Sequence, residues 1–237
     1  MKNVYIYNIV DDKKRYPNEL LLNYLRAQVD NSIRLGWDIK DIIIGTNFDF
    51  EYRGVKNVTL KTICTHNVFY NKFYGMLELM DSGVLDTDFW FHDQDCWQIH
   101  PFEFPQFEGE IGGCTYVFTN EWNTASLLVK KSAADVMEYI VDFMELNKIL
   151  KVDSDENVIS FLRANSEIRE YLTDINQQFN VGYTQMEKRL EAATKPVYAY
   201  GFKPHIEKDF DRFNEIDLIP NEMIDIFRNN NILHTQQ

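Results

Sequence analysis

The spacing of apolar residues divides the first hundred positions into two kinds of segment. Four short runs rich in β-branched and aromatic residues end in polar or turn residues, which is typical of buried strands. They predict strands at 3–10, 41–47, 57–63 and 89–93. Between these runs, apolar residues recur at spacings of three and four, the period of an amphipathic helix. One helix is defined by Leu22, Leu25, Val29 and Ile33, and a second by Phe69, Phe73, Met76 and Met80.

The alternation of strands and helices predicts an α/β fold. Helices of this length join parallel strands, so we expect a mixed, mostly parallel central sheet flanked by helices. Gly36 and Gly83 lie where the C-terminal caps of the two helices are expected. In sheets of this kind, ligands bind beyond the carboxyl ends of the strands.

The pattern after residue 110 is less regular. It predicts strands at 112–120 and 124–130, helices at 136–150 and 154–165, and a last strand with its turn at 195–205. The helix from 154 starts with Ser154 and acidic residues, which favour a helix N-terminus. The tail, 206–237, is polar with a short helix at 221–228. No repeat or linker interrupts the chain, so we expect one domain over 1–237.

Composition narrows the class of protein. The chain has 237 residues, 45% of them hydrophobic, with 17 Phe, 13 Tyr and 4 Trp, which is ample material for a folded core. The net charge of −13 disfavours non-specific binding to nucleic acid phosphates. The three cysteines form neither a metal-ligand pair nor a disulfide framework.

The sequence shows no targeting or membrane segment. The start MKNVYIYNIVDDKK lacks the apolar region of a signal peptide, and no later run approaches the roughly 18–20 apolar residues of a membrane span. We therefore expect a soluble, cytoplasmic protein. A composition rich in Asn, Ile, Lys and Tyr indicates an AT-rich genome, and hence a bacterium or a virus-infected host cell.

The run FWFHDQDCWQI, 89–99, carries apolar residues directly up to two carboxylates, Asp93 and Asp95. In an extended backbone these two side chains project to the same side, whereas Gln94 and His92 project to the other. Two carboxylates at the rim of a sheet, joined by an imidazole or water, are suited to Mg²⁺ or Mn²⁺. The alternative is that both residues only cap a loop, because an Asp-x-Asp triplet is common by itself.

The order strand, helix, strand, strand, helix, followed by DTDFWFHDQDCW, resembles the nucleotide-sugar-dependent glycosyltransferases of the GT-A fold. In that family an aromatic or aliphatic strand ends in Asp-x-Asp. Four further stretches resemble that family in the same order. They are NKFYGMLEL (71–79), EWNTASLLVKKSAADVMEYI (121–140), DSDENVISFL (153–162) and the glycogenin-like GFKPH (201–205). Ala125 stands where Gly is usual in the family. His205 follows the Gly-Phe-Lys-Pro turn, whereas the family's His usually precedes the corresponding turn.

The resemblance implies a nucleotide-sugar-binding half, 1–100, and an acceptor half, 101–205. It implies that Asp95 is the principal ligand of Mn²⁺ or Mg²⁺, with Asp93 also contacting ribose and His205 as a third ligand. The metal would neutralise the diphosphate leaving group of a nucleoside diphosphate sugar. His92, on the other strand face, is expected to be a packed histidine.

Other residues gain roles from the same resemblance. Those expected to contact the donor are Asn8 and Asp11, at the base and ribose, and Lys72 and Lys203, at the diphosphate. Those expected to line the acceptor pocket are Glu121, Asn123 and Trp122, whose ring would stack on a sugar. Asp155 and Glu156 are the catalytic candidates, with Asp155 either deprotonating the acceptor hydroxyl or positioning the acceptor. Each residue also has an ordinary interpretation, as a helix cap, a loop residue or a surface lysine.

Two other functions compete with glycosyl transfer. A sugar-phosphate nucleotidyltransferase would need a glycine-rich basic loop after the first strand, but NIVDDKKRYPNE contains no glycine. A non-catalytic nucleotide-sugar-binding module would not need both carboxylates. The acceptor stays open among glycans, lipid-linked sugars, proteins and modified DNA bases, as do the donor sugar, the stereochemical outcome and the oligomeric state.

Overall fold

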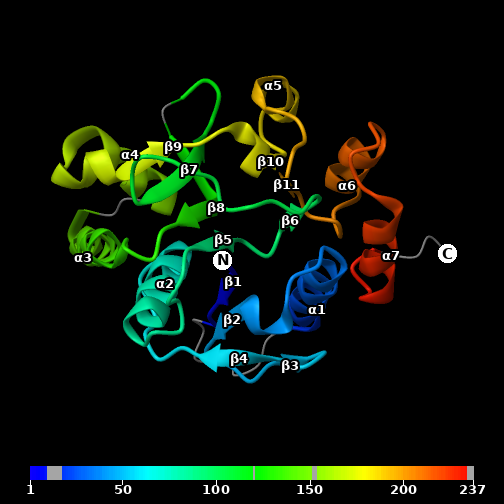
Figure 1. Ribbon diagram of the computed structural model, residues 1–237, viewed down its shortest axis with the longest axis horizontal. Helices are drawn as coiled ribbons and strands as arrows, with labels where there is room; N and C mark the ends of the chain where they lie inside the picture. Colours follow the sequence, from blue (N-terminus) through cyan, green and yellow to red (C-terminus); the bar gives the residue numbers. More distant parts are fainter. Residues whose placement is uncertain (10–17, 120, 151–153, 234–237) are drawn as a thin grey trace.

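The computed structural model describes residues 1–9, 18–119, 121–150 and 154–233 (Figure 1). Within them, an eight-stranded sheet forms the centre of the molecule. In spatial order its strands are β3 (Glu51–Tyr52), β4 (Val55–Thr59), β2 (Ile42–Thr46), β1 (Lys2–Tyr7), β5 (Phe89–His92), β8 (Trp122–Val129), β7 (Ile111–Thr115) and β9 (Leu172–Asp174). Only β3 and β8 run against the other strands, so the predicted mixed, mostly parallel sheet is confirmed.

A second, three-stranded sheet lies beside the first. It consists of β10 (Val181–Gly182), β11 (Ala199–Gly201) and β6 (Cys96–Gln98). Because β6 directly follows the turn after β5 and pairs with β11, this sheet brings GFKPH next to the Asp93–Asp95 turn. Phe202 N donates to the carbonyl oxygen of Asp95 over 2.9 Å and fastens the two turns together.

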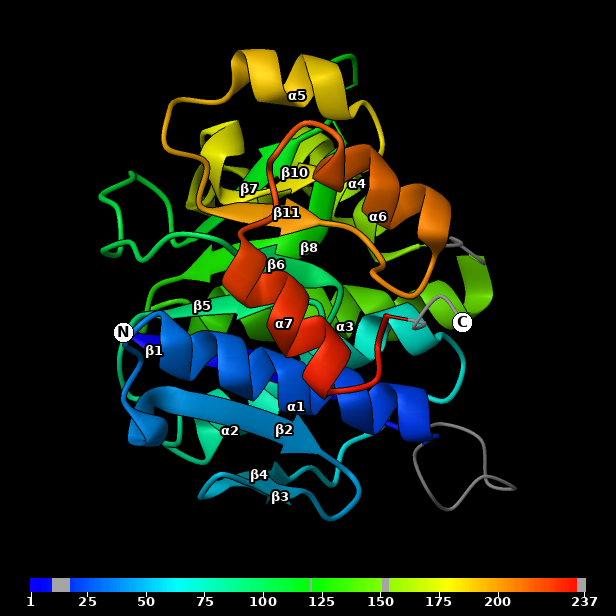
Figure 2. The same ribbon diagram turned by 90° about the vertical axis from the view of Figure 1, so that its right-hand side faces the viewer.

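Helices cover both faces of the large sheet (Figures 1 and 2). On one side lie α2 (Asn71–Asp81), α3 (Ala134–Leu150) and α4 (Asp155–Asn165), and on the other α1 (Glu19–Arg34) with α7 (Asn221–Asn229) against it. The shorter helices are α5 (Met186–Ala192) and α6 (Glu207–Asn214). None of the helices in the described ranges is long and apolar enough to cross a lipid bilayer.

The two-residue period of the strands explains the two apolar layers. In β1, Val4 is buried against the α2 and α3 side, and the next residue, Tyr5, against the α1 side. The helical period gives α1 and α2 one buried face each. Two residues depart from the predicted buried stripes. Phe69 lies in a 3₁₀ turn before α2 and is exposed, and Ile33, in the last turn of α1, is exposed as well.

Gly113 in β7 leaves the space that the ring of Trp122 fills. A Cβ atom at Gly113 would lie 2.6 Å from that ring, which is fully buried and held by a 2.6 Å hydrogen bond from its Nε1 to Asp174. We expect Gly113→Ala to lower the free energy of unfolding by about 1–2 kcal/mol, because overpacking outweighs the gain in strand rigidity. Urea denaturation checks this. The control Val117→Ala, at an exposed residue just beyond β7, should change the free energy of unfolding by less than about 0.5 kcal/mol.

Candidate active site

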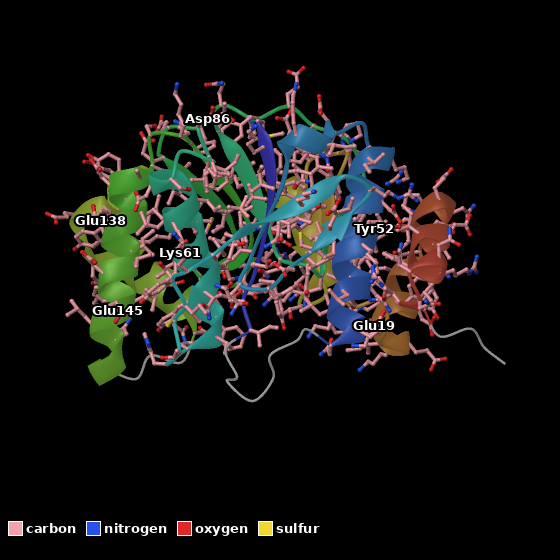
Figure 3. All side chains as sticks on the ribbon, turned by 90° about the horizontal axis from the view of Figure 1, so that it is seen from below. Glu19, Tyr52, Lys61, Asp86, Glu138 and Glu145 are labelled. Atoms are coloured by element: carbon pink, nitrogen blue, oxygen red, sulfur yellow. The ribbon has the colours of Figure 1, made fainter. Side chains whose placement is uncertain are left out.

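Polar side chains from several elements meet at the carboxyl edge of the large sheet. β1 and β5 end there, antiparallel β8 begins there, and the first turns of α2 and α4 lie beside them. Figure 3 gives the direction: Asp86, just before β5, lies at one end of the sheet, and Glu19, at the start of α1, lies at the other. The candidate site is at the Glu19 end.

Asp93 and Asp95 lie in a tight turn rather than in extended chain. The turn is closed by a 3.0 Å hydrogen bond from Cys96 N to the carbonyl oxygen of Asp93. Gln28 on α1 supports it from beneath, donating to the carbonyl oxygens of Gln94 (2.7 Å) and Cys96 (3.0 Å). The assumption of strand alternation between the two carboxylates was therefore wrong, and each carboxylate has its own surroundings.

His92 supports the same turn from inside the protein. Its ring nitrogens lie 2.8 Å from the Cys96 carbonyl oxygen and 2.9 Å from Asn3 Oδ1, and its ring stacks on Trp90. Burial lowers the pKa of His92 to about 3, so the ring is neutral. The prediction of a packed histidine is confirmed.

Lys72 is the centre of the site. Its Nζ lies 3.1 Å from Asp93 Oδ2, 3.0 Å from Asp155 Oδ2 and 3.2 Å from Thr124 Oγ1, while Thr124 donates to Asp155 Oδ2. The side chains of Lys72 and Asp155 are almost completely buried, whereas that of Asp93 is 33% exposed. One ammonium group therefore joins α2 to the end of β5 and to the start of α4.

The charges in this cluster depend on one another. Burial alone would lower the pKa of Lys72, but Asp155 and Asp93 raise it above its usual range, so the ammonium stays charged. Burial raises the pKa of Asp93 to about 6. Lys72 opposes that rise, and Asp95 and Asp155 add to it. It is thus unfavourable for all of these carboxylates to be ionised together, and an added positive charge would reduce their mutual repulsion.

Asp95 faces a cavity of about 210 Å³ between the start of α1 and the turn after β11. Lys203, His205, Tyr24 and Gln94 also line it. Burial raises the pKa of Asp95, and Lys203 opposes this rise. Tyr24 Oη lies 2.7 Å from His205 Nδ1 and holds the imidazole against the cavity wall. GFKPH therefore contributes both of its predicted side chains to this cavity.

Carboxylate and imidazole groups of the kind that bind Mn²⁺ or Mg²⁺ are present at this site. Asp95 and His205 share the cavity, and Asp93 is electrostatically coupled to Asp95. In the described part of the chain, however, no three His, Cys, Asp or Glu side chains are arranged closely enough to hold a metal ion. Asp93 instead has Lys72 as its partner. The metal site stays a prediction.

At the end of β1, Asn8 is buried, and its Nδ2 lies 3.5 Å from Asn71 Oδ1. Among the described residues, Asn8 Oδ1 has no hydrogen-bond partner, as a ligand-binding group would. Asp11, the other residue predicted to contact the nucleoside, lies outside the described residues.

Glu156 lies on the acceptor side, one residue after Asp155 on α4. Ser154 caps this helix, accepting from Asn157 N over 3.1 Å, as predicted. Glu156 Oε1 accepts a 3.0 Å hydrogen bond from Tyr116 Oη, which in turn accepts from Asn123 Nδ2 over 3.1 Å. Burial raises the pKa of Glu156, and the Tyr116 hydrogen bond opposes that rise.

The sequence predicted only some of the residues and roles found at this site. Trp122 is 1% exposed, so the prediction that its ring stacks on a sugar was wrong. Sequence reasoning missed Thr124, Tyr116 and Gln28. Thr124 carried a signal, because it belongs to the Asn-Thr stretch that resembles the glycosyltransferases, whereas Gln28 shows only as a polar residue within an amphipathic helix.

No protein-family model matches the sequence, and neither does any curated protein. Solved structures do match. GlyE of Streptococcus pneumoniae TIGR4, a glycosyltransferase, has a TM-score of 0.61 at 11% identity; the match covers 100% of this chain and 66% of GlyE. An active-site mutant of LgtC has a TM-score of 0.56 at 13% identity, covering 97% of this chain and all of LgtC.

A third structure is a glycosyltransferase involved in glycosylation of the major capsid of PBCV-1. Its TM-score is 0.55 at 7% identity, covering 92% of this chain and 100% of the other. These matches extend over nearly all of the present chain and include its mixed sheet. The chain therefore has the GT-A fold of these glycosyltransferases.

Proposed function

We propose that the protein is a glycosyltransferase that moves a sugar from a nucleoside diphosphate sugar to a hydroxyl group. The observation that carries this proposal is the buried Lys72 between Asp93 and Asp155, at the carboxyl edge of a GT-A sheet. Burying a lysine beside two carboxylates costs desolvation free energy, and groups whose pKa values are shifted in this way are concentrated at functional sites. LgtC, which shares the fold, has been crystallised with donor and acceptor sugar analogues.

The cavity at Asp95 suits the diphosphate end of the donor. Lys203 supplies a cation on its wall, and His205 is held there by Tyr24. If Asp95, Asp93 and His205 hold Mn²⁺ or Mg²⁺, the ion would neutralise the negative charge of the departing diphosphate. In that case His205 would use Nε2, since Tyr24 contacts Nδ1 and orients the ring as an outer partner does.

Asp155 and Glu156 have different roles in this proposal. Asp155 is buried, ion-paired with Lys72 and hydrogen-bonded by Thr124, so it orients the lysine rather than accepting a proton. Glu156 is only partly buried and accepts a hydrogen bond from the Tyr116 hydroxyl. Its carboxylate is therefore the better candidate to take the proton of the acceptor hydroxyl or to orient that hydroxyl.

The function is tested with a panel of nucleoside diphosphate sugars in the presence of manganese. We expect one donor to bind in a calorimetric titration and to release its nucleoside diphosphate slowly, by hydrolysis, even without acceptor. Glu156→Gln should retain binding and lose turnover. Binding without turnover for any donor and acceptor would favour the non-catalytic module, and the absence of any binding would contradict both.

The raised pKa of Asp93 predicts the pH dependence of manganese binding. Below about pH 6 the carboxyl group is mostly protonated, and a protonated carboxyl is a poor metal ligand. We expect manganese, with the cognate nucleoside diphosphate, to bind about tenfold more weakly at pH 5 than at pH 7.5, as measured by calorimetry. Asp93→Asn should weaken binding at both pH values and flatten this dependence.

A further inference from the structure

Arg189 on α5 is a fully buried cation outside both the Lys72 cluster and the Asp95 cavity. Its Nε donates to Gln177 Oε1 over 2.9 Å, and its Nη2 donates to the carbonyl oxygen of Asn180. Both partners are neutral. Across the described ranges, no carboxylate lies within ion-pair distance of this guanidinium, and Nη1 has no hydrogen-bond partner.

A buried charge without a counter-ion lowers stability. The chain nevertheless leaves room for it: a Cβ atom at Gly182 would lie 3.0 Å from Arg189 Nη1 and 3.7 Å from Asn123 Nδ2. A methionine in place of Arg189 would fill similar space without the charge. The charge therefore serves something other than the stability of α5.

Two contacts lead from Arg189 to Glu156. In the first, the guanidinium lies 5.3 Å from the centre of the Tyr116 ring, and Tyr116 Oη donates to Glu156 Oε1. In the second, Asn180, whose carbonyl oxygen accepts from Arg189, donates through Nδ2 to Asn123 Oδ1 over 2.8 Å, and Asn123 Nδ2 donates to Tyr116 Oη. Both contacts end at the same hydroxyl group.

We propose that Arg189 is a positioning residue that keeps the carboxylate of Glu156 ionised and oriented toward the acceptor through Tyr116. This inference rests on the proposed function and deepens it, because it identifies Glu156 as the acceptor-side base and names the residues that prepare it. A cation against the ring makes the Tyr116 hydroxyl a stronger donor, and a stronger donor favours the charged form of the carboxylate.

The charged groups around Glu156 set the sign of the effect. Burial and Asp155 on its own helix raise its pKa, whereas Tyr116 just after β7, Lys72 from α2 and the backbone of Thr124 lower it. The cation of Arg189 on α5 interacts favourably with its negative charge. Removing either the Tyr116 hydroxyl or the Arg189 cation should therefore move the titration of Glu156 to higher pH.

The test is an NMR titration of protein labelled with ¹³C at the side-chain carboxyl of glutamate, without substrate. The signal of Glu156 is assigned by its loss in Glu156→Gln. We expect the midpoint to rise by about half a pH unit or more in Arg189→Met and in Tyr116→Phe. Lys188→Met, at the exposed neighbouring residue whose ammonium lies over the Phe118 ring, should leave the midpoint unchanged.

An unchanged midpoint in Arg189→Met would overturn the proposal. If that variant does not fold, Arg189→Gln, which removes the charge but keeps hydrogen-bonding groups, decides the question by the same measurement. If a donor has been found, the acid limb of the kcat profile should shift by the same amount as the NMR midpoint, with KM for the donor unchanged. Shifted NMR midpoints in a protein that transfers no sugar would contradict the proposed function and leave the Arg189 contact intact.

Discussion

Replacing Lys72 by methionine is expected to lower the free energy of unfolding by about 3–5 kcal/mol at pH 7.5, because it leaves the buried Asp155 and the partly buried Asp93 without their cation. Lys72 is the only charged partner within 4 Å of Asp93 and Asp155 in the described part of the chain. Methionine keeps the length and apolar character of the stem. Any loss beyond that of a surface lysine therefore reports the charge.

The loss should be smaller at pH 5. In the folded protein the pKa of Asp93 is already raised to about 6, and it rises further without Lys72. A carboxyl group whose folded pKa exceeds its unfolded value destabilises the fold when ionised, and this penalty disappears as the pH falls through the folded pKa. Stability of the variant relative to wild type should thus recover between pH 7.5 and pH 5.

Urea denaturation at both pH values measures this effect. Lys56→Met is the matched control, since Lys56 forms an exposed ion pair with Glu51 at 3.3 Å. Exposed pairs of that kind contribute about 0–1 kcal/mol, so the control should change little at either pH. A pH-independent loss in Lys72→Met would contradict the charge argument and indicate lost side-chain contacts instead.

The periodic elements of the fold were predictable from local sequence, and the short ones were not. α1 and α2 have clear apolar stripes, so their existence followed from spacing alone. β6 has only three residues, too few for an alternating pattern to show. α6 reads EKDFDRFN, and the buried face provided by Phe213 is hidden in a polar run. Its stability comes from tertiary contacts rather than from a local signal.

The candidate site was predictable as a set of residues but not as a set of pairs. Asp93, Asp95 and Asp155 stand out because acidic residues at element ends favour chemistry or capping. Their pairing depends on which strand neighbours which, and no local pattern encodes that. Lys72 was expected at the donor diphosphate, and only the fold, which places α2 beside the start of α4, shows that it pairs with Asp155 and Asp93. Arg189 gave no signal at all within QMEKRLEA.

The second large effect is expected for Asp95→Asn, which should lower the rate of sugar transfer by at least about 10²-fold while the protein stays folded. The carboxylate of Asp95 lines the cavity with Lys203 and His205. Its backbone carbonyl oxygen, which accepts from Phe202 N, is unaffected by the substitution. Because burial raises the pKa of Asp95, an uncharged amide of the same shape should not lower the free energy of unfolding.

Initial rates at saturating donor, together with a manganese titration, measure this effect. Asp225→Asn, at an exposed carboxylate of α7 paired with Arg228 at 3.2 Å, is the control and should keep full activity. The two carboxylates of the turn differ in one further respect: Asp93 shares Lys72 with Asp155, and Asp95 has no ion-pair partner within the described ranges. Asp93→Asn should therefore alter both stability and activity, and Asp95→Asn activity alone. Unchanged transfer by Asp95→Asn would remove the cavity from the mechanism, and a matching loss of stability would reassign Asp95 to a structural role.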